Sequence, residues 1–198
     1  ERLALSAKKK IIMFCGTLLD VNPRKGFGML VASLDKLACA MPLDEAEVMV
    51  VGSSGPLAGN VRLPVRYLGR LHDDAAMALA YAASDVLVAP SQEDNLPNTV
   101  MEGMACGTPC VGFAVGGMPD MIEHKINGYL AEPADAGSLA AGIRFVLADE
   151  SRRRSLAEAA RKKVEREYDL ATVAKRYQSL YEDVLGRAGR GERQGEMR

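Results

Sequence analysis

Short runs of unbroken apolar residues alternate along this chain with longer segments that are apolar at helical spacing. The runs are Ile11–Cys15, Val48–Val51, Val65–Leu68, Val86–Ala89, Cys110–Phe113 and Tyr129–Leu130. The helical segments are Phe27–Met41, Asp74–Ser84, Asn98–Cys106, Met118–His124 and Ser138–Leu147. Unbroken hydrophobicity is typical of strands covered on both faces. The alternation therefore predicts an α/β fold, a Rossmann-like open parallel sheet with helices on both faces.

The rest of the chain suggests one domain with two flanking segments. Two further helices are expected at Ser151–Glu167 and Leu170–Leu185. We expect the apolar stripe of the second to pack on the core, with packing of part of it on a partner domain as the alternative. Residues 10–185 then form the domain, and residues 1–9 read as a linker remnant at a domain boundary. Residues 186–198 are rich in Gly, Arg, Glu and Gln, which predicts a disordered tail.

The charge and histidine content narrow the possible partners. The net charge is −1, from 25 basic and 26 acidic residues, so no overall field favours nucleic acid and any anion site must be local. His72 and His124 are the only histidines and lie far apart in sequence. We therefore expect no metal site and no Ser/His/Asp triad.

The cysteines and the apolar runs indicate the compartment. Cys15, Cys39, Cys106 and Cys110 lie in apolar runs without zinc or thioredoxin spacing, so we expect reduced core residues. The apolar runs are much shorter than the roughly 20 residues that span a bilayer. These features predict a cytoplasmic protein.

The strongest candidate site lies between an expected strand and helix, in residues 85–102. Open parallel sheets bind ligands at the carboxyl ends of their strands, where this loop falls. Pro97 suits the first turn of a helix, because its missing N–H would have no helical partner there. Asp94 and Asn95 are expected to cap that helix.

The start of this helix has the features of a phosphate site. Backbone N–H groups around Leu96, Asn98 and Thr99 would point to the cleft at the positive end of the helix dipole. Glu102 lies one turn after Asn98, on the same face, where a carboxylate can accept hydrogen bonds from the vicinal hydroxyls of a ribose. A capping role or pairing with an arginine is an equal alternative for Glu102.

A second candidate loop joins the first strand to the first long helix. Arg24 and Lys25 precede that helix and either bind an anion together with its N-terminus or form a solvated pair. The loops at Gly69–His72, Val115–Asp120 and Lys125–Gly128 read first as tight turns. Neither GxxxxGK[ST] nor GxGxxG occurs.

Several of these segments resemble one enzyme family. Pro90-Ser91, Asp94 and Glu102–Val111 are similar to the central block of the donor-binding, C-terminal domain of GT-B fold retaining glycosyltransferases of family 4. Val115–Asp120 and Asn127–Leu130 resemble the segments that follow it. The loop Asn22–Phe27 and the helix from Tyr168 to Leu185 also match, so the resemblance covers about residues 10 to 185.

The resemblance implies roles for individual residues. Lys25, aided by Arg24 and the backbone of Leu96–Thr99, would bind the donor diphosphate. Asp94 and Glu102 would be the catalytic carboxylates, Asp94 at the transferred sugar and Glu102 at the ribose. Asp94 replaces the usual glutamate, and the neighbouring Glu93 is a possible substitute. The remaining matched positions are Gly69 and Arg70 beside the base, and Thr17 where an arginine is usual.

The same resemblance implies a reaction and partners. The chain would be one lobe of a two-domain enzyme that transfers a hexose, with retention and without a metal or other cofactor, from a nucleotide-diphosphate sugar to a glycan or lipid-linked acceptor. Polysaccharide synthesis and a peripheral place at the inner membrane surface are family-level expectations. An acceptor-binding N-terminal lobe, absent here, would be needed for turnover. The alternatives are half of a sugar-nucleotide epimerase and a non-catalytic nucleotide-binding module.

Overall fold

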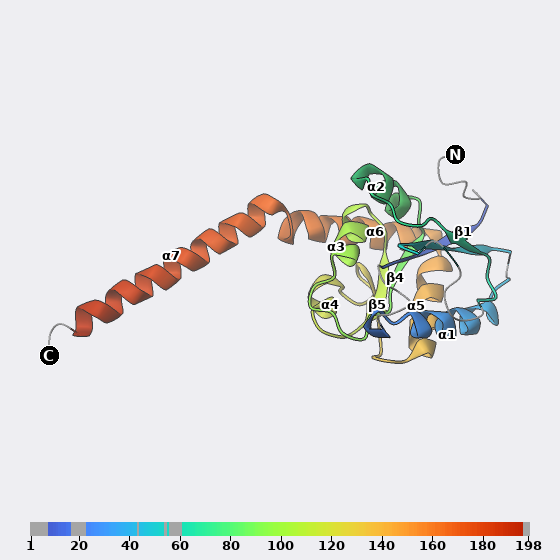
Figure 1. Cartoon of the computed structure of the whole chain (residues 1–198), viewed down its shortest axis with the longest axis horizontal. Coiled ribbons are helices and arrows are strands. Elements are labelled where there is room, and N and C mark those ends of the chain that lie inside the picture. The colour runs from blue at the N-terminus through green and yellow to red at the C-terminus, as the bar shows by residue number, and fades with distance from the viewer. Residues whose placement is uncertain (1–7, 17–22, 43, 54, 56–60, 196–198) are drawn as a thin grey trace. The chain divides into compact units, whose positions relative to one another are not determined.

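A computed structural model of the chain describes residues 8–16, 23–42, 44–53, 55 and 61–195, the last ten as backbone only (Figure 1). Six strands form one sheet in the order β3-β2-β1-β4-β5-β6, and every neighbouring pair is parallel. The strands are β1 (Lys10–Cys15), β2 (Ala46–Val51), β3 (Val65–Tyr67), β4 (Val86–Ala89), β5 (Cys110–Phe113) and β6 (Gly128–Ala131). This confirms the predicted fold class.

Helices cover both faces of the sheet. In Figure 1, α1 and α5, which pack together, lie below the sheet, and α2 lies above it, where it contacts α3. The helices are α1 (Phe27–Ala38), α2 (Asp74–Ala82), α3 (Asn98–Ala105), α4 (Met118–Met121), α5 (Ala136–Leu147), α6 (Glu150–Glu167) and α7 (Leu170–Gly195), and a 3-10 turn, η1, spans Pro23–Lys25.

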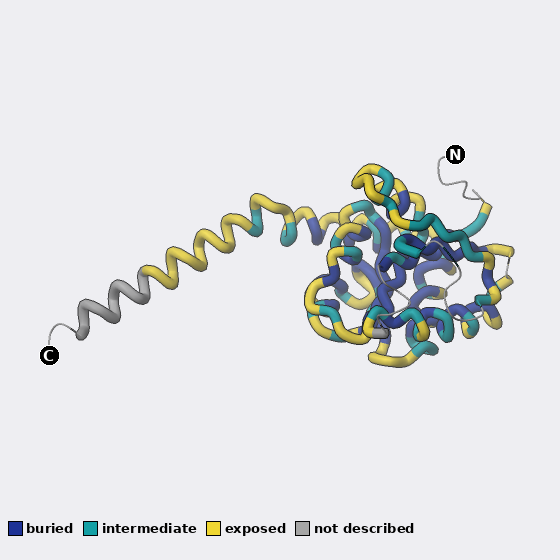
Figure 2. The backbone as a smooth tube through the Cα atoms, in the orientation of Figure 1, coloured by how far each residue is buried: buried dark blue, intermediate teal, exposed yellow. Residues whose placement is uncertain are grey.

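The unbroken hydrophobicity of the strands follows from this layering. Ile12 and Phe14 of β1 belong to the core cluster that includes the apolar faces of α1 and α5. Ile11 and Met13 point to the opposite face of the sheet and are also buried. Figure 2 shows the buried backbone running through the sheet. Since both faces are covered, the four central positions of β1, Ile11 to Phe14, are all apolar and buried.

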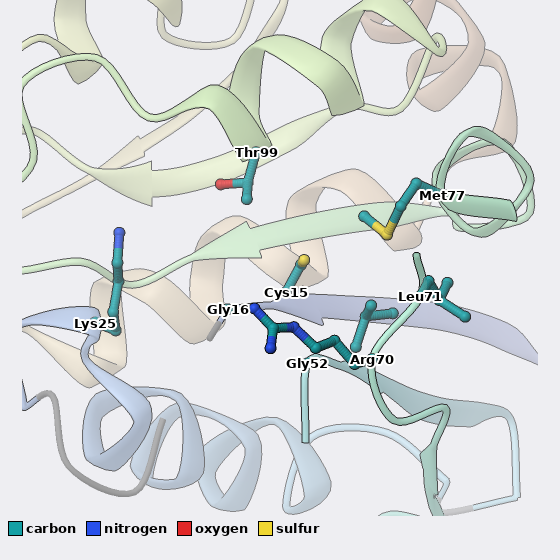
Figure 3. Close-up of a pocket in the computed structure, with 9 residues that line it drawn as sticks. Cys15, Gly16, Lys25, Gly52, Arg70, Leu71, Met77 and Thr99 are labelled. Carbon is teal, nitrogen blue, oxygen red and sulfur yellow. The ribbon is translucent and has the colours of Figure 1, made fainter. Parts of the chain in front are cut away.

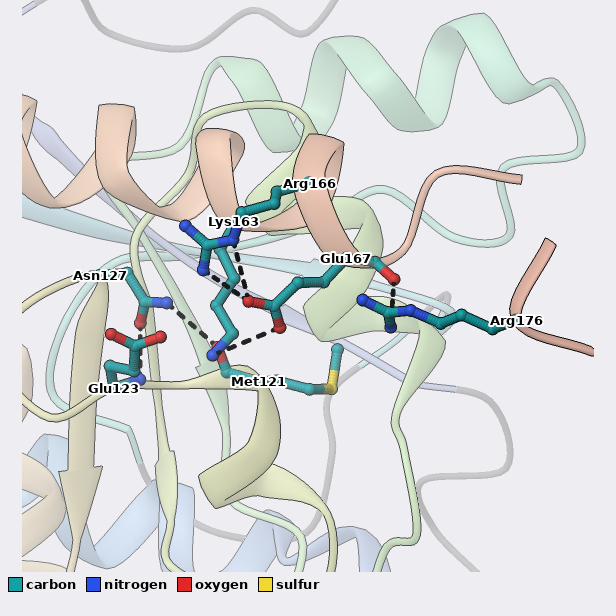
Figure 4. A network of polar contacts seen from close by, with 7 residues as sticks. All are labelled: Met121, Glu123, Asn127, Lys163, Arg166, Glu167 and Arg176. Carbon is teal, nitrogen blue, oxygen red and sulfur yellow. Dashed lines mark hydrogen bonds and ion pairs between the residues drawn. The ribbon is translucent and has the colours of Figure 1, made fainter. Parts of the chain in front are cut away.

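The turn between α4 and β6 is held by one buried side chain. Asn127 is 2% exposed; its Nδ2 donates to the Met121 carbonyl at 3.1 Å, and its Oδ1 accepts from the Glu123 N–H at 2.8 Å (Figure 4). The predicted turn at Lys125–Gly128 is therefore present. Lys125 adopts a left-handed backbone conformation there, with φ 63.

The chain divides into two compact units between Lys162 and Lys163. Within the second unit, Glu167 at the end of α6 makes ion pairs with Lys163 at 3.7 Å and Arg166 at 2.5 Å (Figure 4). The Arg176 guanidinium donates to the Glu167 carbonyl at 3.1 Å, which satisfies one of the free carbonyls at that helix end. The hydrogen bond from Arg166 lowers the pKa of Glu167.

Helix α7 is longer than the helix that the sequence predicted. It continues to Gly195, whereas the expected helix ended at Leu185, and 196–198 lie outside the described residues. No proline interrupts this stretch, and extending a formed helix fixes only one residue per hydrogen bond. On the apolar stripe of α7, Leu170 is 83% exposed and Tyr181 is 62% exposed. None of the helices in the described ranges is long and apolar enough to cross a membrane.

Candidate functional site

Two of the predicted loops meet at the carboxyl edge of the sheet, after β1 and β4. The contact depends on Gly26, whose φ is 71 and where a Cβ would lie 1.7 Å from the Pro90 carbonyl oxygen. Only glycine fits both the conformation and the approach. The Gln92 N–H donates to the Arg24 carbonyl at 2.9 Å, which fastens the loops together.

A third loop, residues 115–120, packs against the loop that follows β4. Gly116 has φ 52, and a Cβ at this position would lie 1.9 Å from the Asp94 carbonyl oxygen. The Gly117 N–H donates to that same carbonyl at 3.3 Å. The sequence predicted a tight turn at 115–120 and a resemblance to a family segment, but not this contact, in which its glycines let the loop brace the backbone of Asp94.

The bracing places Asp94 against Lys25. Lys25 Nζ lies 2.9 Å from Asp94 Oδ2, and the two side chains are 37% and 17% exposed. An ion pair this accessible stabilises the fold by about 1 kcal/mol or less, so its main effect is to position the two groups. The sequence predicted both residues but not their pairing, because 69 residues separate them.

An open cavity of about 280 Å³ adjoins Lys25 (Figure 3). Lys25, Arg70 and Thr99 line it together, and Figure 3 shows the Arg70 guanidinium extending over the end of β1. The full lining is Cys15, Gly16, Lys25, Val51, Gly52, Arg70, Leu71, Met77 and Thr99. Gly69 is held beside it, since its carbonyl accepts from the Gly52 N–H at 2.8 Å.

The N-terminus of α3 has no side-chain cap. The helix begins at Asn98 with Pro97 in the N-cap position, so the expected capping by Asp94 and Asn95 is wrong. The Asp94 carboxylate pairs with Lys25 instead. The amides at the start of α3 are thus available to an anion, and Thr99 there lines the cavity. Leu96 is 41% exposed at the same end.

A second cavity, of about 410 Å³, contains Glu102. Glu102 is exposed, and its Oε2 accepts a hydrogen bond from the Tyr81 hydroxyl at 2.8 Å. The partner that the structure shows for Glu102 is therefore a tyrosine. Met77 lines both cavities, so they share a wall. The lining is Asp74, Met77, Ala78, Tyr81, Glu102, Ala105 and Cys106.

Tyr81 is a site residue that sequence reasoning missed. Only 1% of the residue is exposed, and its hydroxyl bonds both Glu102 and the Cys15 side chain. Burial raises the pKa of Tyr81, so the hydroxyl stays protonated and acts as a donor. Burial also raises the pKa of Cys15, which makes it a neutral thiol rather than a nucleophilic thiolate. The one available signal was a lone tyrosine in an alanine-rich helix.

The cysteine prediction was partly wrong. All four cysteines are free, as expected, but only Cys110 is a fully buried core residue. Cys39 is exposed, and Cys15 and Cys106 are half-buried at the cavities. Cys15 ends β1 and so lies at the carboxyl edge of the sheet, whereas Cys39 and Cys106 are the C-cap residues of α1 and α3.

Of the eleven predicted site residues, four line one of the two cavities: Lys25, Arg70, Thr99 and Glu102. Arg24 and Glu93 are exposed beside the site, and Arg24 contributes its carbonyl to the loop contact. Thr17 lies outside the described residues. Among the residues that are described, no group of three or more His, Cys, Asp or Glu side chains is arranged to hold a metal ion.

Comparison with known proteins agrees with this geometry. The model of the family "Glycosyl transferases group 1" matches residues 9–149. The chain is 33% identical over 150 residues to the N-acetyl-alpha-D-glucosaminyl L-malate synthase of Bacillus anthracis, a match covering 71% of this chain and 38% of the relative. The chain thus spans well under half the length of this relative.

Two solved structures have the same fold. Sucrose-phosphate synthase from Thermosynechococcus elongatus matches 93% of this chain and 48% of its own, with a TM-score of 0.78 and 29% identity. The Anabaena protein HepE in complex with UDP-glucose matches 89% of this chain and 50% of its own, with a TM-score of 0.72 and 23% identity. The second likeness bears on the fold alone.

Proposed function

Since this chain belongs to the glycosyl transferases group 1 family, we propose that it is the donor-binding domain of a retaining hexosyltransferase. The donor is a nucleotide-diphosphate sugar, and the acceptor is a hydroxyl of a glycan or glycolipid. The observation that carries this proposal is the Lys25–Asp94 pair beside the uncapped start of α3.

The cavity around Lys25 suits a diphosphate. A lysine ammonium and helix-end amides are both strong donors to phosphate oxygens, and Arg70 adds a second positive charge on the same lining. The chain as a whole carries a net charge of −1, so this concentration of positive charge is local. Arg24 is exposed next to Lys25 and contributes to the same field.

Glu102 suits the ribose of the nucleotide. Its carboxylate is exposed in the neighbouring cavity, and a carboxylate has about four acceptor positions, of which Tyr81 uses one. Vicinal hydroxyls can therefore still donate to it. Met77 between the two cavities separates a phosphate-binding part from a nucleoside-binding part.

Donor binding would exchange the partner of Lys25. A diphosphate carries more charge than Asp94, so we expect the ammonium to turn to the phosphates and release the carboxylate. Asp94 would then accept hydrogen bonds from the hydroxyls of the sugar. As the bond between the sugar and the diphosphate breaks, Lys25, Arg70 and the α3 amides would stabilise the growing negative charge of the leaving group. This route requires no metal and no enzyme nucleophile.

The acceptor would bind to residues outside this domain, which agrees with the share of the relative that the chain spans. The chain alone is then expected to bind nucleotide weakly and to transfer no sugar. The missing lobe of the same enzyme would complete the active site. Transfer at a normal rate by residues 1–198 alone would contradict this part of the proposal.

The test is a calorimetric titration of the chain with UDP, GDP and ADP. We expect one of the three to bind, and Lys25→Ala and Glu102→Ala each to weaken it about tenfold, the loss of one charged hydrogen bond. Lys36→Ala, an exposed lysine of α1, is the control and should bind as the parent does. A chain that binds none of the three nucleotides would favour a domain without a nucleotide-binding role.

A further inference from the structure

A third cavity lies away from the proposed donor site, against the edge strand β6. Its volume is about 320 Å³, at the lower end of the roughly 300–1,000 Å³ typical of small-molecule sites. The lining residues come from the turn before β6, from β6 itself, from α5 and from the start of α6: Lys125, Tyr129, Ala141, Arg144, Phe145, Ala148 and Arg152.

Two aromatic rings form the apolar part of this cavity. The rings of Tyr129 and Phe145 lie 5.6 Å apart, and both residues are half-buried. Behind them the His124 ring packs on Tyr129 at 4.5 Å, which fixes the orientation of the tyrosine. The rings thus offer a rigid, partly accessible surface, of the kind on which the C–H groups of a sugar ring pack.

Three cations surround these rings, and no acidic residue lines the cavity. Lys125 Nζ lies 6.0 Å from the Tyr129 ring centre and 5.8 Å from that of Phe145. Arg152 stacks on Phe145 at 4.3 Å and donates to its carbonyl at 2.9 Å. Both positive charges therefore lie at the aromatic surface, although Lys125 is exposed and the Arg152 side chain is 38% exposed.

Only one of the three cations has a carboxylate partner among the described ion pairs. Arg152 lies 3.6 Å from Asp149, and a backbone hydrogen bond from Arg152 lowers the pKa of Asp149, which keeps it ionised. Lys125 and exposed Arg144 have no such pair in the part of the chain that the structure describes. Their charges are therefore available to an anion.

The cavity is separate from the donor site by position in the fold. Lys125 precedes β6 and so lies at its amino end, whereas the donor loops follow the carboxyl ends of β1 and β4. In a parallel sheet all amino ends of the strands lie on one side and all carboxyl ends on the opposite side. A ligand here would not compete with a nucleotide sugar for Lys25 or Glu102.

We propose that this cavity binds a sugar monophosphate. The phosphate would be held between Lys125 and Arg144, with Arg152 beside it, and the sugar ring would pack on Tyr129 and Phe145. The volume suits one phosphorylated ring rather than a whole nucleotide sugar. This inference does not depend on the proposed function, because none of its residues belongs to the donor site.

The experiment is a titration followed by NMR and calorimetry, with glucose 6-phosphate, inorganic phosphate and glucose as probes. Glucose 6-phosphate is expected to bind at least about tenfold more tightly than inorganic phosphate, since only the former also uses the rings. Glucose alone should not bind measurably. The shifted resonances should belong to residues around β6 and α5.

Two variants test the cations. Lys125→Asn keeps a residue that tolerates φ 63, and Arg144→Gln changes an exposed position, so neither is expected to unfold the chain. Each should weaken glucose 6-phosphate about tenfold. Lys36→Ala is the matched control: its side chain lies beside Gly137 at the other end of α5, and it should bind normally.

Several outcomes would overturn the proposal. They are no binding of glucose 6-phosphate at millimolar concentration, equal affinity for inorganic phosphate, or unchanged affinity in both variants. Competition by the nucleotide that binds at Lys25 would also contradict it, because the ligand would then occupy the donor site. Nucleotide binding by both variants at parental affinity would show that the donor site is intact.

Discussion

The Tyr81 hydroxyl donates to Glu102 Oε2 at 2.8 Å, joining α2 to α3 at the wall of the second cavity. Tyr81 is 1% exposed while Glu102 is exposed, so a rigid buried group orients a carboxylate that solvent can reach. The geometry assigns Tyr81 a positioning role. Several measurements follow from this and from the other contacts of the site.

Removing the Tyr81 hydroxyl should loosen Glu102. Tyr81→Phe is expected to weaken nucleotide binding about fivefold and to lower the free energy of unfolding by about 1 kcal/mol, the usual contribution of one hydrogen bond. Calorimetry and urea unfolding measure the two effects. Tyr177→Phe, at a residue that is 57% exposed on α7, should change neither. If Tyr81→Phe bound the nucleotide as tightly as the parent protein does, Tyr81 would not position Glu102.

Gly26 should tolerate no side chain. Gly26→Ala would bring a Cβ to 1.7 Å from the Pro90 carbonyl at φ 71, and should cost about 2 kcal/mol or more in the free energy of unfolding and separate the two loops. Gly28→Ala is the matched control, since nothing lies within 4 Å of its added Cβ. Because position 28 lies in helix α1, Gly28→Ala should raise the free energy of unfolding by about 0.5–1 kcal/mol. Equal stability of the two variants would contradict the close approach.

Removing the negative charge that pairs with Lys25 should strengthen the binding of phosphate groups. Asp94→Asn is expected to raise the affinity for the bound nucleoside diphosphate by up to about fivefold, because an exposed ion pair of about 1 kcal/mol no longer competes. The same change in the complete enzyme should lower sugar transfer. Weaker nucleotide binding by Asp94→Asn would mean that Asp94 aids the phosphate site directly.

The stability of the fold should fall at alkaline pH. Burial raises the pKa values of Cys15, Cys110 and Tyr81 above their ordinary values of 9.0, 9.0 and 10.0. Each group therefore holds its proton more tightly in the folded chain, so its contribution to the free energy of unfolding is complete below its ordinary pKa and is lost as the pH rises from there toward its raised pKa. Urea unfolding at pH 8, 9 and 10 measures the decline. In Cys110→Ala the slope should be smaller.

The rate at which Cys15 is chemically modified is a second, independent measure of the first cavity. Exposed Cys39 should react with iodoacetamide at pH 8 well before Cys15, whose pKa burial raises and which is half-buried in the first cavity. Bound nucleotide should slow Cys15 further and leave Cys39 unchanged. Mass spectrometry of the digested protein follows both. Faster reaction at Cys15 would contradict its neutral state.

The sequence predicted the fold better than the site because the two depend on different information. Strands β4 and β5 were predicted with the bounds that the structure has, since unbroken apolar runs are a local signal. The Lys25–Asp94 contact depends on β1 and β4 being neighbours in the sheet, an order that no local pattern encodes. Backbone approaches such as that of Gly26 are likewise invisible until the loops are placed. The continuation of α7 was missed because composition alone suggested disorder.

The neighbouring position of β1 and β4 also has a consequence for synthesis of the protein. Every segment between them, including β2, β3 and α2, must leave the ribosome before the Gly26 loop can find Pro90. A nascent chain released earlier would carry Lys25 but nothing to orient it. Ligand-dependent protection of growing chains should therefore begin only after α3 has emerged.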